Sequence, residues 1–272
     1  MYIFNKNGIK ITGLMKDPED ERDFKISLMK TTLPKYKDWQ NMMSPVKHQG
    51  QLGSCVGFAI TAMKEFQEQR EHKKEVEEGK KNHRDEKYYD LAEAWIYWMC
   101  KKIDPWPNKE GTSIRHAMQV LQKIGVPTEK AWPYDDKIYG EPKMWAPLVA
   151  KWSKIKSYRR IVGINDLKVA LRSGPVTVGI GCYEEIYKPD YNGFIKYPKN
   201  PNYCYGGHAV CLVSYNDNTN RCKFKNSWGT SWGKKGYGSL SYDYLKDFMW
   251  DAWSCQDLSV TKEMMKGTLK LL

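Results

Sequence analysis

The spacing of apolar residues changes near residue 155 of the 272-residue chain. Before this point apolar residues recur at helical intervals, and after it short β-branched or aromatic runs are separated by Gly and Asn. Helices gathered in one half of a chain and strands in the other are typical of an α+β protein, because each kind of element buries its apolar face separately. We therefore expect a mainly helical lobe over about residues 50–150 and a β lobe over about residues 155–256.

Three helices are expected in the first half of the chain. The first begins near Ser54 and continues through CVGFAITAMKEFQEQ, the second covers YYDLAEAWIYWMCKK, and the third covers SIRHAMQVLQKIG. Ser113 can cap the start of the third helix and Gly125 its end. In the second half, strands are expected at GPVTVGIG, GGHAVCLVSYN, CKFKNSW and GYGSLSY.

The two ends of the chain differ from its middle. Residues 1–32 contain the acidic cluster DPEDERD and too few periodic apolar residues to build a core, so we expect a leader or arm. The main domain then spans residues 33–256, and residues 257–272 form a C-terminal tail.

Composition restricts the class of protein. A hydrophobic content of 41% is enough for a substantial core. No apolar run approaches the roughly 18 residues that cross a bilayer, and Met1 to Asp20 lacks the apolar centre of a secretory signal, so no membrane partner is expected. The net charge of +12 does not predict nucleic-acid binding, because lysines between Lys64 and Lys87 alternate with acids and no binding motif accompanies them. That stretch is expected to be a solvated helix or an inserted arm.

Cys55 lies where a glycine-containing loop meets an expected helix, in VKHQGQLGSCVGFAI. The unpaired N–H groups and positive dipole end of a helix stabilise a thiolate, so this position suits a nucleophile. Gln49, across a loop tightened by Gly50 and Gly53, can donate its amide to a developing oxyanion together with the Cys55 N–H. The alternatives are a small buried hydrophobic residue for Cys55 and an ordinary surface residue for Gln49.

His208 is the best candidate for a base that activates the thiol. It follows two glycines and opens an expected strand, which can hold its ring in place. The alternative is a hydrogen-bonded core histidine. The other histidines lie in polar or helical contexts: His48, His72, His83 and His116.

Asn226, in KFKNSWGTSWGKKGYG, can orient this histidine. Its side-chain carbonyl can accept a hydrogen bond from one imidazole nitrogen and so direct the other nitrogen to the thiol. Trp228 can then shield that hydrogen bond from water. A plain turn between strands is the alternative.

A zinc site at CYGGHAVC is not expected. In a strand, His208 and Cys211 are an odd number of residues apart, so their side chains point to opposite faces. The sequence also contains no C-x-x-C pair. We therefore expect neither a metal nor another cofactor.

Taken together, these segments resemble the papain-like cysteine proteases, the family of papain and the cathepsins. QGQLGSC matches the family's cysteine loop, GGHAV its histidine strand, and KNSWGTSWGKKGYG its Asn-Ser-Trp-Gly segment. The stretch EGTSIRHAMQVLQKIGVPTEKAWPYDD resembles bacterial and viral branches more than animal cathepsins. The resemblance spans about Leu33 to Cys255.

The resemblance implies a papain-like two-lobed fold, with a helical lobe, an antiparallel β-barrel-like lobe and the active site in the cleft between them. It implies Cys55 as nucleophile, His208 as general base and then acid, Asn226 as the orienting residue and Gln49 as the oxyanion donor. It also suggests a set of substrate-binding residues, against the alternative of plain loops: Gly111, Thr112, Gly207 and Trp228.

The chain departs from the family pattern near the nucleophile. Val56 replaces a residue that is usually aromatic, and Leu52 replaces a cysteine that forms a disulfide in the family. Cys204 and Cys255 fall near another family disulfide, which we expect only in an oxidising compartment. Since six cysteines besides Cys55 could pair, the compartment stays open, with a cytoplasmic or virion-associated location favoured by the absence of a signal.

The function expected from these residues is that of an endopeptidase that hydrolyses protein or peptide substrates through an acyl-enzyme. Residues 1–32 could be a short propeptide, as in a zymogen, trimmed near Leu33; a permanent arm is the alternative. In FMWDAWSC, aromatic residues could line a specificity wall or simply fill the core: Phe248, Met249, Trp250 and Trp253. The rival functions are a thioester-forming transpeptidase or isopeptidase, and a non-enzymatic scaffold that binds or builds a structure such as a virus particle.

Overall fold

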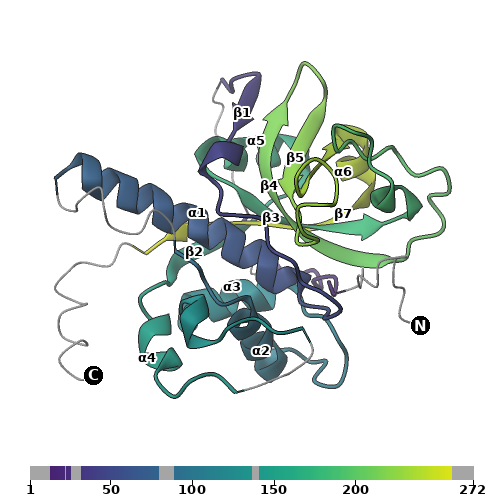
Figure 1. Cartoon of the computed structure of the whole chain (residues 1–272). Helices are drawn as coiled ribbons and strands as arrows, with labels where there is room; N and C mark the ends of the chain where they lie inside the picture. The colour runs from purple at the N-terminus through teal and green to yellow at the C-terminus, as the bar shows by residue number, and fades with distance from the viewer. Residues whose placement is uncertain (1–12, 22, 26–31, 80–88, 137–140, 259–272) are drawn as a thin grey trace.

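The computed structural model describes residues 13–21, 23–25, 32–79, 89–136 and 141–258, which form two lobes (Figure 1). The helical lobe contains α1 (Cys55–Glu77), α2 (Glu93–Ile103), α3 (Ile114–Lys123) and the short α4 (Ala146–Ala150). The three helices expected from sequence are therefore confirmed. Ser113 caps α3 through its side-chain oxygen, and Gly125 follows its end with φ +91°.

The second lobe is built on a seven-stranded antiparallel sheet. Its strand order is β2-β7-β3-β4-β5-β6, and β1 also pairs with β4. The strands are β1 (Tyr36–Asp38), β2 (Ile155–Arg160), β3 (Val176–Cys182), β4 (Gly206–Asn216), β5 (Arg221–Lys225), β6 (Tyr237–Ser241) and β7 (Met249–Asp257). Two further helices, α5 (Gly163–Ser173) and α6 (Tyr242–Phe248), pack on this sheet, and 3₁₀ turns lie at Gln40–Met42, Glu129–Ala131 and Glu184–Tyr187. The α+β two-lobed expectation is confirmed.

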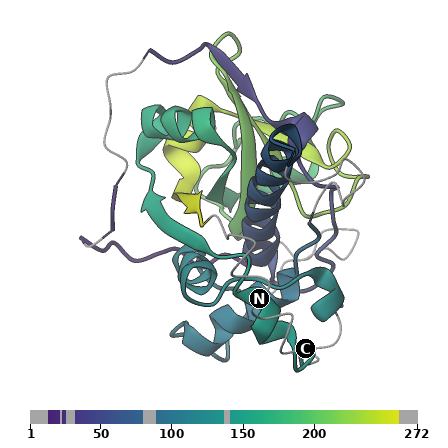
Figure 2. The same cartoon turned by 90° about the vertical axis from the view of Figure 1, so that its left-hand side faces the viewer.

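Helix α1 joins the two lobes. Its first turns pack against strand β4 on one side and against α2 and α3 on the other, as both views of the molecule show (Figures 1 and 2). Residues Cys55 to Phe66 are consequently all buried. Because the helix is enclosed on every side, its N-terminal end is held in one place between the lobes.

The second half of α1 emerges from the body and carries the mixed charges of the Lys64–Lys87 stretch as far as Glu77. Residues 80–88 lie outside the described part. The expectation of a solvated helix is wrong at Lys64, because this residue is buried. Its Nζ lies 2.7 Å from Glu68 Oε1 and also pairs with Asp257, so two carboxylates compensate the buried charge.

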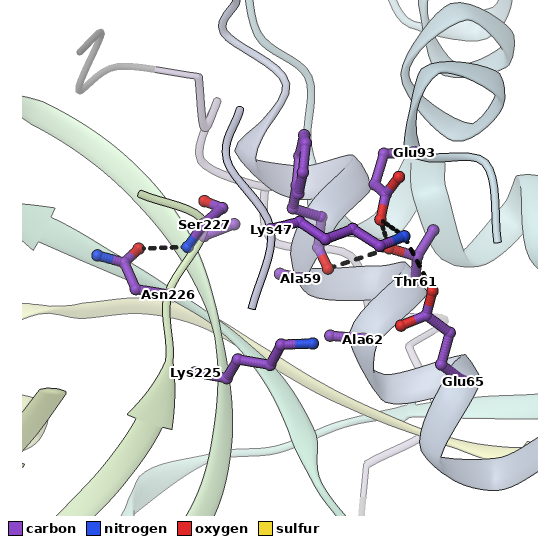
Figure 3. A pocket seen from close by; sticks show the side chains of 11 residues that line it. Lys47, Ala59, Thr61, Ala62, Glu65, Glu93, Lys225, Asn226 and Ser227 are labelled. Carbon is purple, nitrogen blue, oxygen red and sulfur yellow. Dashed lines mark hydrogen bonds and ion pairs between the residues drawn. The ribbon is translucent and has the colours of Figure 1, made fainter. Parts of the chain in front are cut away.

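A buried polar cluster lies between α1 and the sheet, and Asn226 is among the residues that line it (Figure 3). Lys47 Nζ lies 2.6 Å from Glu93 Oε1 and 3.2 Å from Glu65 Oε1. Lys225 Nζ donates to Ser44 Oγ at 2.8 Å, and Ser44 in turn donates to Glu65. Burial lowers the pKa of Lys225. Charges from both lobes thus compensate one another in this cluster.

The cysteines form no disulfide in the structure. Cys255 lies against Met63 and Gln67 of α1, with its sulfur 3.3 Å from Gln67 Nε2, whereas Cys204 is exposed and lies beside Gly181 of β3. The expected Cys204–Cys255 pair is therefore wrong for this chain. Within the described ranges, no helix combines the length and apolar character needed to cross a bilayer.

Gly125 offers a test of the packing that fixes α3. A Cβ at this position would overlap the carbonyl oxygen of Ala150, and its φ of +91° is unfavourable for other residues. We expect Gly125→Ala to lower the free energy of unfolding by about 1–3 kcal/mol in denaturant titration. Gly79→Ala is the matched control, because Gly79 has φ +69° and a Cβ there meets nothing within 4 Å. Equal losses in the two variants would contradict the packing argument.

Candidate active site

Cys55 is the first residue of α1 and is completely buried. Its sulfur lies beside strand β4, where the N–H of Ala209 donates to Sγ at 3.5 Å. The N–H groups of Val56, Gly13 and Cys55 itself also face the sulfur. A helix end and a strand from the other lobe therefore meet at this thiol.

His208 precedes Ala209 on β4, the residue whose N–H contacts the Cys55 sulfur. Its Nε2 is 2.8 Å from Asn226 Oδ1, while Nδ1 has no hydrogen-bond partner in the described part of the chain. Asn226 Oδ1 also accepts from the N–H of Ser227 at 2.8 Å. One side of the imidazole is thus held and the other is available for a proton.

Trp228 covers the histidine. Its ring is completely buried, and its centroid lies 4.7 Å from that of His208. Trp228 also stacks on Tyr187, with 6.1 Å between the ring centroids and 8° between the ring planes. Tyr187 has no sequence signal of its own and was missed in the sequence analysis. The aromatic cover keeps water from the histidine–asparagine hydrogen bond.

Gln49 is also completely buried, which excludes the surface alternative. Its Oε1 accepts from Ser227 Oγ at 2.6 Å, and its Nε2 donates to the Leu52 carbonyl at 3.0 Å. Its backbone N–H donates to the Ser227 carbonyl at 2.8 Å, so the Asn226 segment fixes the Gln49 loop. Ser227 is therefore a positioning residue, which no sequence pattern indicated.

The N-terminal segment of the chain crosses the site. Residues 13–15 adopt an extended conformation between the two lobes. Gly207 O accepts from the N–H groups of Gly13 and Leu14 at 3.3 and 3.2 Å, while Thr112 donates to Gly13 O at 3.1 Å and accepts from Met15 N at 2.9 Å. Two of the residues proposed to bind substrate therefore hydrogen-bond the backbone of the chain's own arm.

The fit of this segment depends on small residues. A Cβ on Gly13 would lie 2.9 Å from Cys55 Sγ, and a Cβ on Gly111 would lie 2.8 Å from Gly13 O. The side chain of Leu14 is 5% exposed and fills a pocket beside Gly179 and Ile114. The arm thus lies directly against the Cys55 sulfur, with Thr112 and Gly207 bonded to its backbone.

In the FMWDAWSC segment, Phe248 ends helix α6 and the residues from Met249 onward lie in strand β7. Trp250 lies against Gly207 and Gly181 and so contributes to the wall of this region. Trp253 is completely buried in the core, and Phe248 packs on Tyr183, Tyr197 and Tyr244. Trp228 contacts His208 rather than the arm.

Burial controls the ionisation of the two central groups. It raises the pKa of the Cys55 thiol to about 11, although the surrounding N–H groups act in the opposite direction. It lowers the pKa of His208 to about 4, against the effect of the Asn226 hydrogen bond. At neutral pH the covered site therefore contains a thiol and a neutral imidazole. Among the described residues, no group of three His, Cys, Asp or Glu side chains is arranged to hold a metal ion.

Comparison with known proteins assigns the family. The family model described as papain family cysteine protease matches residues 33–247. The chain belongs to this family. Its fold matches the crystal structure of xylellain, a cysteine protease from Xylella fastidiosa, with a TM-score of 0.79 and 28% identity over 94% of this chain and 100% of xylellain.

Curated relatives agree with this assignment. An uncharacterized peptidase C1-like protein from Acanthamoeba polyphaga mimivirus is 28% identical over 91% of this chain and 87% of its own length. Cathepsin J from Mus musculus is 28% identical over 88% of this chain and 68% of its own length. The papain-like protein is thus a cysteine peptidase, with similarity to viral and bacterial members.

The effect of the arm on thiol reactivity can be measured. In Leu14→Glu a carboxylate replaces the buried leucine, so the arm should leave the cleft and solvent should lower the Cys55 pKa. We expect alkylation of Cys55 by iodoacetamide at pH 7 to accelerate at least about tenfold, because more thiolate is present. Phe24→Glu is the matched control in the same arm, since Phe24 is 79% exposed. The alkylation rate is measured by mass spectrometry of the Cys55 peptide. Equal alkylation rates for Leu14→Glu and wild type would show that the arm does not control the reactivity of Cys55.

Proposed function

We propose that the chain is an endopeptidase in which Cys55 attacks peptide bonds with the help of His208 and Asn226. The observation that carries the proposal is the meeting of the α1 end with strand β4, where Cys55 Sγ contacts the residue next to His208. A nucleophile, a base and a group that orients the base are the minimum set for this chemistry, and all three are contributed here by rigid elements.

The reaction proceeds in two steps. His208 takes the thiol proton, and the Cys55 sulfur attacks the substrate carbonyl carbon to form a tetrahedral oxyanion. Gln49 Nε2, which has a second hydrogen besides the one given to Leu52 O, and the Cys55 N–H stabilise this oxyanion. The C–N bond breaks as His208 returns the proton to the leaving amine. Water, deprotonated by His208, then attacks the thioester, and the thiol leaves with a proton.

Extended polypeptide is the substrate class that the cleft favours. Thr112 offers both an N–H and a carbonyl to a passing chain, and Gly207 offers a carbonyl from the opposite side. This pattern is strand addition, which binds the backbone without regard to sequence. Selectivity must then come from side-chain pockets, and the Leu14 pocket favours a branched apolar residue there.

The arm supports a self-inhibited state. The group of the arm that faces the Cys55 sulfur is the N–H of Gly13, while Gly13 O is bonded to Thr112. A chain in this position keeps a substrate carbonyl from reaching the sulfur. We propose that residues 1–32 act as the inhibitory leader, that residues 33–256 form the peptidase domain, and that trimming occurs near Leu33.

Removal of the nucleophile tests this proposal. We expect full-length Leu14→Glu to cleave an unfolded protein substrate into internal fragments. The double variant Leu14→Glu with Cys55→Ala should release no fragments, because it lacks the nucleophile. Masses of the fragments, with and without an added amine, report hydrolysis or transfer. The chain itself should be trimmed near Leu33 only when Cys55 is present. Fragments of equal yield without Cys55 would refute the assignment of the nucleophile.

A further inference from the structure

Two carboxylates of the arm are bound into the body of the protein beyond the active site. Asp17 is 2% exposed. Its oxygens accept from the backbone N–H of Arg115, each at 3.3 Å, and Oδ2 accepts from Trp253 Nε1 at 2.9 Å. Asp17 thus sits at the first turn of α3, where helix N–H groups favour an anion.

The second carboxylate, Asp23, is held by two guanidinium groups. Arg115 Nη2 lies 2.5 Å from Asp23 Oδ2, and Arg160 Nη1 lies 3.0 Å from the same oxygen. The Asp23 side chain is 8% exposed. Ion pairs this close and this buried are stronger than exposed pairs, because water screens them less.

The donors of this site belong to the body and persist without the arm. The guanidinium carbons of Arg115 and Arg160 each lie 5.6 Å from the Trp253 ring, which holds the cluster in place. Arg160 has a partner within the body, Asp251, at 3.0 Å. Asp251 also faces Asp17, and burial followed by the Asp17 charge raises its pKa to about 6.

Arg115 differs from Arg160 in this respect. The described hydrogen-bond partners of its guanidinium are the Asp23 carboxylate and the Pro18 backbone carbonyl, and both belong to the arm. Its Nε has no hydrogen-bond partner among the described residues, although the residue is only 8% exposed. Once the arm leaves, Arg115 therefore presents a guanidinium and a helix N–H without the carboxylates that compensate them here.

The cluster is a continuation of the cleft. Thr112, which pairs with the backbone of residues 13–15, lies three residues before Arg115, at the start of α3. Asp17 is three residues beyond Leu14, which corresponds to about 10 Å of extended chain. A peptide that fills the Leu14 pocket can therefore reach this cluster with a nearby side chain.

We infer that a carboxylate-recognition subsite selects substrates with Asp or Glu about three residues beyond the residue in the Leu14 pocket. The Arg115 N–H and Trp253 Nε1, which bind Asp17 here, form it together with the guanidinium groups of Arg115 and Arg160, which the departure of Asp23 frees to face the substrate carboxylate. The arm occupies this subsite with its own Asp17 and Asp23. The inference rests on the proposed peptidase function and adds a second specificity element to it. An amide side chain in the same place lacks the charge and brings an NH₂ group against the donors, so the subsite discriminates Glu from Gln.

The experiment uses the full chain with the arm disabled by Leu14→Glu, Asp17→Asn and Asp23→Asn. Peptide pairs carry Leu at the pocket position and either Glu or Gln three residues farther from the cleaved bond on the same side. We expect kcat/KM to be about tenfold higher for the Glu peptide at low salt, since a charge-assisted hydrogen bond is gained. The ratio should fall as salt is added, because the ion pair becomes screened.

Adding Arg115→Gln should bring the Glu/Gln ratio close to one. Arg159→Gln is the matched control, because Arg159 neighbours Arg160 on β2 and is exposed; it should keep the ratio. A ratio near one before any arginine is replaced, or a ratio that survives Arg115→Gln, overturns the inference. If Arg115→Gln fails to fold, the salt dependence of the ratio in the parent chain decides.

Failure of the peptidase proposal gives a different result. If neither peptide is cleaved, the two peptides are compared by how strongly they slow the labelling of Cys55 by a thiol-directed epoxide. Stronger protection by the Glu peptide supports the subsite without any turnover, and equal protection overturns it. Cleavage of both peptides at equal rates leaves the peptidase function intact and removes the subsite.

Discussion

The contact between the first turn of α1 and strand β4 is the constraint on which the site depends. The helix is enclosed by both lobes, so its N-terminal residue cannot move away from the strand that carries His208. The Asn226 segment then fixes the remaining parts: one oxygen of Asn226 holds His208, and Ser227 holds Gln49. The buried ion pairs behind Asn226 connect the lobes around this contact, and breaking one of them would leave an uncompensated charge.

The arm, proposed above as an inhibitory leader, uses the same geometry. Its backbone pairs with Gly207 and Thr112, and its Gly13 N–H faces the Cys55 sulfur. The carboxylates of the arm extend this contact along α3, so the arm is held by backbone pairing, by an apolar pocket and by ion pairs together.

Much of the fold and of the site was predictable from sequence, because local patterns carried it. Helical spacing of apolar residues predicted α1 to α3. The motifs QGQLGSC, GGHAV and KNSWG predicted the site residues, because short loops or single strands fix the neighbours of each. Strand β7 was missed because an aromatic-rich stretch of this kind does not reveal its period before its partners are known. The burial of Lys64 was not predictable because its partner Asp257 is 193 residues away in sequence. The ion pairs of Asp23 were not predictable because Arg115 and Arg160 are 92 and 137 residues away. The Cys204–Cys255 expectation, carried over from the resemblance, failed because Cys255 faces α1 in this chain.

The central claim is that Cys55 and His208 form an interacting acid–base pair once the arm has left. NMR titration of ¹⁵N-labelled histidine in full-length Leu14→Glu, with and without Cys55→Ala, measures this directly. The account predicts that His208 of the open chain stays protonated well above its ordinary pKa because a thiolate faces it, and that replacing Cys55 lowers this pKa by more than about one unit. An identical His208 titration in both chains would contradict the account.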